Sequence, residues 1–238
     1  MKMIGIILTL LMFVTTFQGL ISAEKPCTRS ESDFIKKKYY RRLVLVTGCA
    51  RSGTTFMSEF LCKNGLDVPH ENIGKDGSVS WPMAVDDIVS PWGPCTKDYE
   101  FDHVFLQLRN PLKVISSVYV SEPPQSWAYI CQHIKEIKKR DSHLTRCVKY
   151  WIYWNLKAEE KADFIYQIEK LEGVVGKMSA ILQRPLDKKL VSTISKNTNT
   201  RYFPDKKEFT WKELKQQLDP DLYKLLKEVA WHYGYSVK

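Results

Sequence analysis

The apolar positions of this chain fall into two kinds of segment that alternate along it. Short continuous apolar runs predict strands that are buried on both faces, as in a parallel sheet. Such runs occupy residues 43–47, 104–108 and 164–168. Segments with helical spacing of apolar residues follow, at residues 54–63, 143–161 and about 173–182. Strands that alternate with helices predict an α/β fold in which a central parallel sheet is flanked by helices.

Several helix boundaries have sequence signals of their own. Thr210 and Glu213 have the spacing of a capping box. Asp219-Pro220 opens the last predicted helix, which has one apolar face and ends at Gly234. Pro111 suits the first turn of another helix. Residues 72–102 and 196–209 have few apolar periods and are expected to be rich in loops, which carry binding sites in sheets of this class.

The first 23 residues differ from the rest of the chain. Lys2 is followed by an apolar run and a weakly polar end at Ala23, which predicts a cleaved signal peptide. A signal anchor retained over residues 3–22 is the alternative. Residues 24–41 are a polar, basic lead-in and residues 42–238 one domain. Both alternatives place that domain outside the cytosol. It would be secreted, periplasmic or in the lumen of the endoplasmic reticulum or Golgi. It would contact a membrane only if the N-terminal segment is kept as an anchor.

All six cysteines follow this leader, and an even number in an oxidising compartment permits disulfides. Their spacings match no zinc pattern. Cys49 and Cys62 are expected to be buried thiols. The better candidates for bridges are Cys27, Cys95, Cys131 and Cys147.

The formal net charge is +9, with the basic residues spread along the chain. Such a charge attracts anions. No nucleic-acid-binding motif is present, so a small anionic ligand or an acidic acceptor is favoured over nucleic acid.

One loop carries a specific chemical signal. Gly48 to Thr55 lie between a predicted strand and a predicted helix, where backbone N–H groups can converge on a phosphate. The two glycines fit the Walker pattern, but Thr54 stands where that pattern has its lysine. The cation of the loop is Arg51 instead. This disfavours a nucleoside triphosphatase or kinase and favours an anion site that works without a metal.

A second motif is independent of the first. Arg109 ends a predicted strand, and Ser117 follows eight residues later on the next predicted helix. Two helical turns bring Ser117 back over the strand end, so both side chains are expected to reach one phosphate.

The two motifs together resemble those of sulfotransferases that use 3′-phosphoadenosine 5′-phosphosulfate (PAPS). In that family an Arg-Ser-Gly-Thr-Thr loop binds the 5′-phosphosulfate, and an arginine and a serine hold the 3′-phosphate. The resemblance covers about residues 43–236, with supporting similarity at 150–155, 162–169 and 209–214. It implies the P-loop-like sulfotransferase fold, PAPS as the sulfonate donor and Arg51 as a catalytic cation. It also implies a donor site formed by Arg51, Ser52, Gly53, Thr54, Thr55, Arg109 and Ser117.

The same resemblance suggests further site residues. An acceptor hydroxyl must lose its proton as it attacks, and Glu71, with His70 as the second candidate, lies at a suitable distance after the loop. Residues 76–81 would border the acceptor pocket or form an ordinary turn. Trp127 would stack on adenine or pack in the core. A late basic loop with Arg201, or Lys196, would close over the 3′-phosphate or be solvated.

The sequence therefore predicts a sulfotransferase that moves the sulfonate of PAPS to an acceptor hydroxyl. A carbohydrate acceptor suits the predicted compartment, while a protein tyrosine or a small molecule is also compatible. The first alternative is a catalytically degenerate member of the fold that binds a nucleotide or a partner. The second is a small-molecule kinase.

Overall fold

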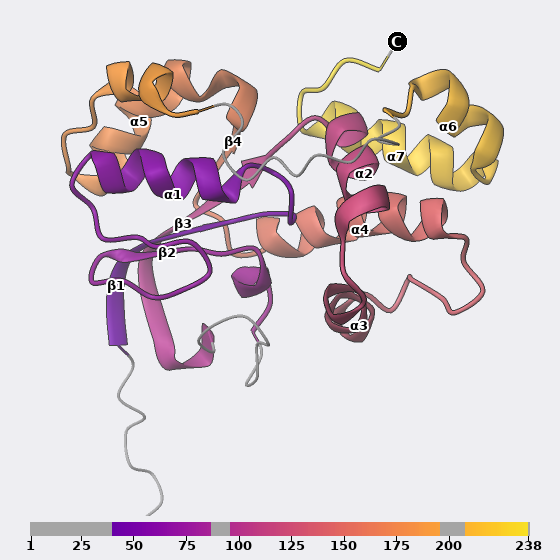
Figure 1. Cartoon of the computed structure of the whole chain (residues 1–238), viewed down its shortest axis with the longest axis horizontal. Helices are drawn as coiled ribbons and strands as arrows, with labels where there is room; N and C mark the ends of the chain where they lie inside the picture. Colours follow the sequence, from indigo (N-terminus) through magenta and orange to yellow (C-terminus); the bar gives the residue numbers. More distant parts are fainter. Residues whose placement is uncertain (1–39, 87–95, 196–207, 238) are drawn as a thin grey trace, which may run out of the picture. The chain divides into compact units, whose positions relative to one another are not determined.

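Four parallel strands form the central sheet, in the order β2-β1-β3-β4 (Figure 1). This computed structural model describes residues 40–86, 96–195 and 208–237. The strands are β1 (Tyr40–Thr47), β2 (Gly77–Val79), β3 (Tyr99–Leu108) and β4 (Phe164–Gln167). The predicted α/β class, a parallel sheet flanked by helices, is confirmed.

The two inner strands are longer than their apolar runs. Val44 to Thr47 and Phe105 to Leu108 are buried, whereas the first residues of both strands are exposed or half-buried. Tyr40 pairs with Tyr99, and the Arg41 side chain forms an ion pair with Asp102. The predicted strands began too late, because the apolar pattern detects only the half of each strand that packs between helices.

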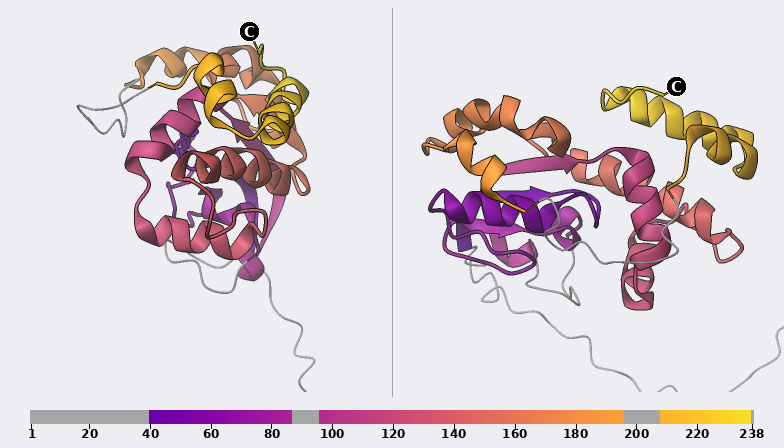
Figure 2. Two further views of the ribbon diagram at one scale, coloured as in Figure 1. Left: turned by 90° about the vertical axis from the view of Figure 1, so that its right-hand side faces the viewer. Right: turned by 45° about the horizontal axis from the view of Figure 1, so that its top comes forward.

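Helices cover both faces of the sheet (Figures 1 and 2). α1 (Thr54–Lys63) and α5 (Leu171–Leu182) share a core cluster with Val44, Val46 and Phe105. The other cluster contains Leu106 and Leu108 and is formed by five more helices. These are α2 (Pro111–Ser121), α3 (Pro124–His133), α4 (His143–Glu159), α6 (Trp211–Gln217) and α7 (Pro220–His232).

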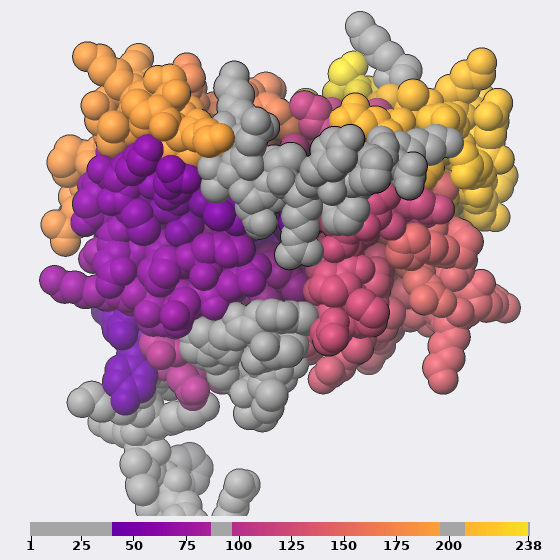
Figure 3. Space-filling view, in the orientation of Figure 1, coloured from indigo at the N-terminus to yellow at the C-terminus, as the bar shows by residue number. Residues whose placement is uncertain are grey.

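The capping box of α6 and the Asp219 cap of α7 occur as predicted. Short 3-10 turns occupy η2 (Pro82–Ala84), η3 (Thr96–Asp98), η4 (Ile168–Lys170) and η5 (Lys188–Thr193). The segment expected to be loop-rich, residues 72–102, contains the edge strand β2 and the start of β3. β2 has only three residues, too few for a periodic pattern. In the space-filling view the surface of residues 40–86 lies beside that of α2 to α4 (Figure 3).

The described residues all belong to one contact unit. The predicted signal peptide or anchor and most of the lead-in lie outside the described residues. Within the described ranges, no helix is both long enough and apolar enough to cross a membrane. Among the described residues the thiols of Cys49 and Cys147 are free and buried, and those of Cys62 and Cys131 are free and exposed. The expectation of burial is thus confirmed for Cys49 and wrong for Cys62. Cys27 and Cys95 lie outside the described residues, so the disulfides stay a prediction.

Candidate functional site

A large pocket lies at the carboxyl ends of β1 and β3, where open parallel sheets usually bind ligands. Its volume is about 1410 Å³, more than the roughly 300–1,000 Å³ that encloses one drug-sized ligand. The structure brings the two sequence motifs together here, because Arg51 and Arg109 both line the pocket. The other predicted residues that line it are Ser52, Gly53, Thr54, Thr55, His70, Glu71 and Ser117.

The loop between β1 and α1 is tightly bent. Gly48 packs so closely on β3 that a Cβ atom there would lie 2.2 Å from the Gln107 carbonyl oxygen, so no other residue fits. Gly53 has φ +92°, and Arg51 adopts φ +68°. A left-handed backbone is uncommon for a residue with a side chain and costs roughly 1–3 kcal/mol. The rest of the fold must therefore hold Arg51 in place.

Three side chains from neighbouring elements hold this loop. The Ala50 N–H donates to the Tyr150 hydroxyl oxygen on α4 at 2.7 Å. The Arg51 carbonyl accepts from Arg109 Nη1 at 2.8 Å, and the Ser52 carbonyl accepts from Gln107 Nε2 at 2.9 Å. Two successive carbonyls are thus bonded to side chains at the carboxyl end of β3, from Gln107 within the strand and Arg109 directly after it, and neither is available to repel an anion in the pocket.

The N-terminus of α1 is suited to an anion. No side chain caps this end of the helix, and its first turn contains no acidic residue. Helix N-termini carry unsatisfied N–H groups and a positive partial charge. The Ser52 side chain is 1% exposed, lines the pocket, and its Oγ has no hydrogen-bond partner among the described residues. A bound phosphate or sulfate oxygen would satisfy such a group.

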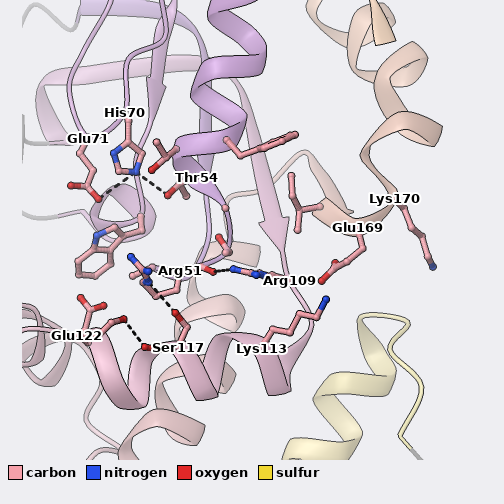
Figure 4. A pocket seen from close by; sticks show the side chains of 18 of the residues that line it. Arg51, Thr54, His70, Glu71, Arg109, Lys113, Ser117, Glu122, Glu169 and Lys170 are labelled. Atoms are coloured by element: carbon pink, nitrogen blue, oxygen red, sulfur yellow. Dashed lines mark hydrogen bonds and ion pairs between the residues drawn. The ribbon is translucent and has the colours of Figure 1, made fainter. Parts of the chain in front are cut away.

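The opposite wall of the pocket is one face of α2. Lys113, Ser117 and Ser121 follow each other at intervals of four residues and all line it. Arg51 Nε donates to Ser117 Oγ at 3.1 Å, which directs the Arg51 side chain across the pocket (Figure 4). Asn110 caps this helix through bonds from the N–H groups of Leu112 and Lys113. The cap fixes where this face begins, directly after Arg109.

His70 and Glu71 reach the pocket from the other side of Arg51 (Figure 4). His70 Nε2 lies 2.9 Å from Thr54 Oγ1 and 3.5 Å from Glu71 Oε1. Burial, and then the positive charge of Arg51, lower the pKa of His70 below its usual value. The imidazole is therefore neutral at pH 7. The Glu71 N–H donates to the Val79 carbonyl of β2 at 2.9 Å, which ties the backbone of Glu71 to the sheet edge.

Backbone strain is concentrated at this site. In the described ranges, three residues other than glycine have positive φ, namely Arg51, Glu71 at +54° and Gln183. The first two line the pocket. Strained residues of this kind often occur where function requires a fixed geometry.

Charge is divided along the pocket. Arg109, Lys113 and Lys170 lie on one side of Arg51, whereas His70, Glu71 and Glu122 lie on the other (Figure 4). Glu169 is on the basic side, where it accepts from the Asn110 N–H at 2.8 Å and from the Tyr235 hydroxyl at 3.2 Å. The basic side suits an anionic ligand. The acidic side suits a neutral molecule that gives up a proton.

The structure bears on some of the open alternatives and not on others. The ring of Trp127 packs against the core, in contact with His143 and Tyr150, and is not among the residues that line the pocket, which favours core packing over stacking on adenine. Trp81 is 4% exposed, lies in the core and borders the pocket. The basic-loop candidates Lys196 and Arg201 lie outside the described residues.

Sequence reasoning missed several residues of the site, Glu169 and Lys170 of the pocket lining among them. Lys113 could have been found, since it lies on the same helix face as Ser117, one turn earlier. Gln107 and Tyr150 gave no usable signal, because both lie within patterns that look like ordinary core. Glu122 gave no usable signal either. In the described part of the chain, no group of three His, Cys, Asp or Glu side chains is placed to hold a metal ion.

Comparison with known proteins gives little further information. No family model and no curated protein matches this chain. Among solved structures, the mouse sulfotransferase SULT7A1 complexed with PAP is similar over 81% of this chain and 83% of its own. The identity is 13% and the TM-score 0.35, which is too low to support an argument about function. The function must therefore be argued from the pocket itself.

Proposed function

We propose that this protein is a sulfotransferase that moves the sulfonate group of PAPS to an acceptor hydroxyl. One observation carries the proposal: Arg51, in an anion-binding loop, and Arg109, at the end of the next strand, line one pocket. A nucleotide with phosphate groups at both its 5′ and 3′ ends needs two such positions.

The residues fit this donor. The uncapped N-terminus of α1 and the unpaired Ser52 hydroxyl would hold the 5′-phosphosulfate. Arg109 and Ser117 would hold the 3′-phosphate, and Lys113, one turn before Ser117 on α2, would add a charge-assisted hydrogen bond. Thr54 stands in place of the Walker lysine, which a nucleoside triphosphate site needs on the β- and γ-phosphates, so the loop fits a triphosphate less well.

Arg51 is placed to assist the transfer itself. As the acceptor oxygen bonds to sulfur, the bond between sulfur and the bridging phosphate oxygen breaks, and its electron pair stays on that oxygen. A guanidinium and preorganised N–H groups stabilise this charge where it develops. The products are the sulfated acceptor and 3′,5′-diphosphoadenosine.

Glu71 is the proposed general base that takes the proton of the acceptor hydroxyl. His70 is the less suitable candidate, because its Nε2 already lies at hydrogen-bond distance from Thr54. We assign His70 the role of orienting the Thr54 and Glu71 side chains. A carbohydrate hydroxyl is the proposed acceptor, in keeping with an extracytosolic location, which likewise stays a proposal because it depends on residues 1–23.

The test is transfer from PAPS carrying labelled sulfonate to a panel of glycans, tyrosine peptides and phenols. Wild-type protein should label at least one class, and Arg51→Ala should reduce transfer by at least about 100-fold, the usual effect of losing one such donor. Arg184→Ala is the matched control, since Arg184 is exposed and does not line the pocket. Nucleotide binding without transfer to any acceptor would instead support the degenerate binding protein, and an active Arg51→Ala would remove the assignment of the loop.

A further inference from the structure

A buried amide lies directly beneath the anion-binding loop. The Gln107 side chain is 0% exposed and has partners at both ends. Its Nε2 donates to the Ser52 carbonyl at 2.9 Å, and its Oε1 accepts from the Tyr166 hydroxyl at 2.5 Å. The chain Tyr166–Gln107–Ser52 therefore connects β4, through β3, to the loop.

The pairing of the strands places these groups. Gln107 and Tyr166 are direct partners in the register of β3 and β4. Burial raises the pKa of Tyr166 far above its usual value, so its hydroxyl keeps its proton and can donate. The Ser52 carbonyl can only accept, so it fixes which end of the amide faces the loop, and the Tyr166 hydroxyl donates to the amide oxygen at the other end.

The direction of one peptide unit follows from this bond. In a trans peptide the carbonyl and the next N–H point in opposite directions. With the Ser52 carbonyl held beneath the loop by Gln107, the Gly53 N–H must point away from β3. Gly53 can take the required φ of +92° because it has no Cβ; a Cβ there would make ordinary van der Waals contacts, 3.5 Å from Ile168 and 3.6 Å from Gln107 Nε2, so the constraint is the backbone angle.

We propose that Gln107 and Tyr166 are positioning residues of the anion site, which keep the Ser52–Gly53 peptide turned so that its N–H faces the bound phosphate. This inference rests on the proposed function, and it adds a support that lies on the sheet rather than in the pocket. Without it, the peptide could rotate and present its carbonyl to the anion.

The test compares two ligands on purified variants. Tyr166→Phe removes the hydroxyl alone, and Gln107→Met replaces the amide by an apolar chain of similar length. Tyr233→Phe is the matched control, since it also loses a buried tyrosine hydroxyl bond, to Glu159, at a site outside the pocket. The ligands are 3′,5′-diphosphoadenosine, which reaches the loop, and adenosine 3′-phosphate, which lacks the 5′ group.

We expect Tyr166→Phe to weaken binding of the diphosphate about three- to tenfold and Gln107→Met roughly ten- to 100-fold. Binding of adenosine 3′-phosphate should change less than twofold in both. The double variant should bind no more weakly than Gln107→Met, because the two side chains act as one unit.

Three outcomes would overturn the inference. If Tyr166→Phe lowers the melting temperature as Tyr233→Phe does but leaves diphosphate affinity unchanged, the pair is only structural. If both ligands lose affinity equally, the effect is not on the loop. If the wild-type protein does not bind the diphosphate at all, the proposed function fails, and this inference fails with it.

Discussion

Glu71 is the residue on which the chemical step depends in this account. Glu71→Gln keeps the shape of the side chain but cannot accept a proton. We expect the turnover number to fall by roughly 100- to 10,000-fold, the usual contribution of a general base. The dissociation constant of 3′,5′-diphosphoadenosine, measured by calorimetry, should stay within about twofold. A collapse of this affinity would show that Glu71 is structural.

His70 allows a test through pH. Its pKa is lowered in the folded protein by burial and by Arg51, whereas in the unfolded chain it is about 6.5. Below pH 6.5 the unfolded state therefore binds more protons than the folded state, so stability falls as the pH is lowered. Near pH 7.5 His70 is neutral in both states and contributes no pH dependence.

His70→Gln removes this titration. Denaturant unfolding at several pH values between 7.5 and 5 should show a smaller loss of unfolding free energy in His70→Gln than in the wild-type protein. Equal slopes for both proteins would mean that the imidazole is not shielded from protonation, contrary to the contacts described here.

At the scale of elements, the start of α2 connects stability to binding. Asn110 caps the helix, Pro111 occupies its first position, and Arg109 precedes the cap directly. Asn110→Ala should lower the unfolding free energy by about 1 kcal/mol. It should also weaken binding of 3′,5′-diphosphoadenosine severalfold, because Arg109 and Lys113 lose their fixed spacing.

Asp219→Ala is a close control for this prediction. Asp219 caps α7 in the same way, accepting from the second and third N–H groups, and Pro220 follows it. This variant should lose similar stability without losing affinity for the nucleotide. If the two variants lose affinity equally, the position of α2 is not specific to the site.

The elements were also predictable to different degrees. α1, α4 and α7 could be predicted because their apolar faces and caps are local signals. The polar halves of β1 and β3 and the edge strand β2 could not, because cross-strand pairing stabilises them rather than any pattern of their own. α3 was missed because its buried positions are only Ser126, Tyr129 and Ile130, which give too short an apolar pattern.

At the scale of the whole molecule, the sequence correctly predicted that two motifs separated by 58 residues would lie at one pocket. Parallel pairing of β1 with β3 explains this, since both strands end at the same edge. The supports from Gln107, Tyr150 and Glu169 could not be predicted. Each is defined by a contact between elements, and a single sequence contains no record of that contact.

The central claim is that one pocket binds both phosphate ends of a nucleotide. The most direct test is calorimetric binding of 3′,5′-diphosphoadenosine, adenosine 5′-phosphate and adenosine 3′-phosphate to the wild-type protein in excess EDTA. We predict that the diphosphate binds at least about 100-fold more tightly than either monophosphate, since each end adds charge-assisted hydrogen bonds. Equal affinity for the diphosphate and one monophosphate, or binding that requires magnesium, would contradict the account.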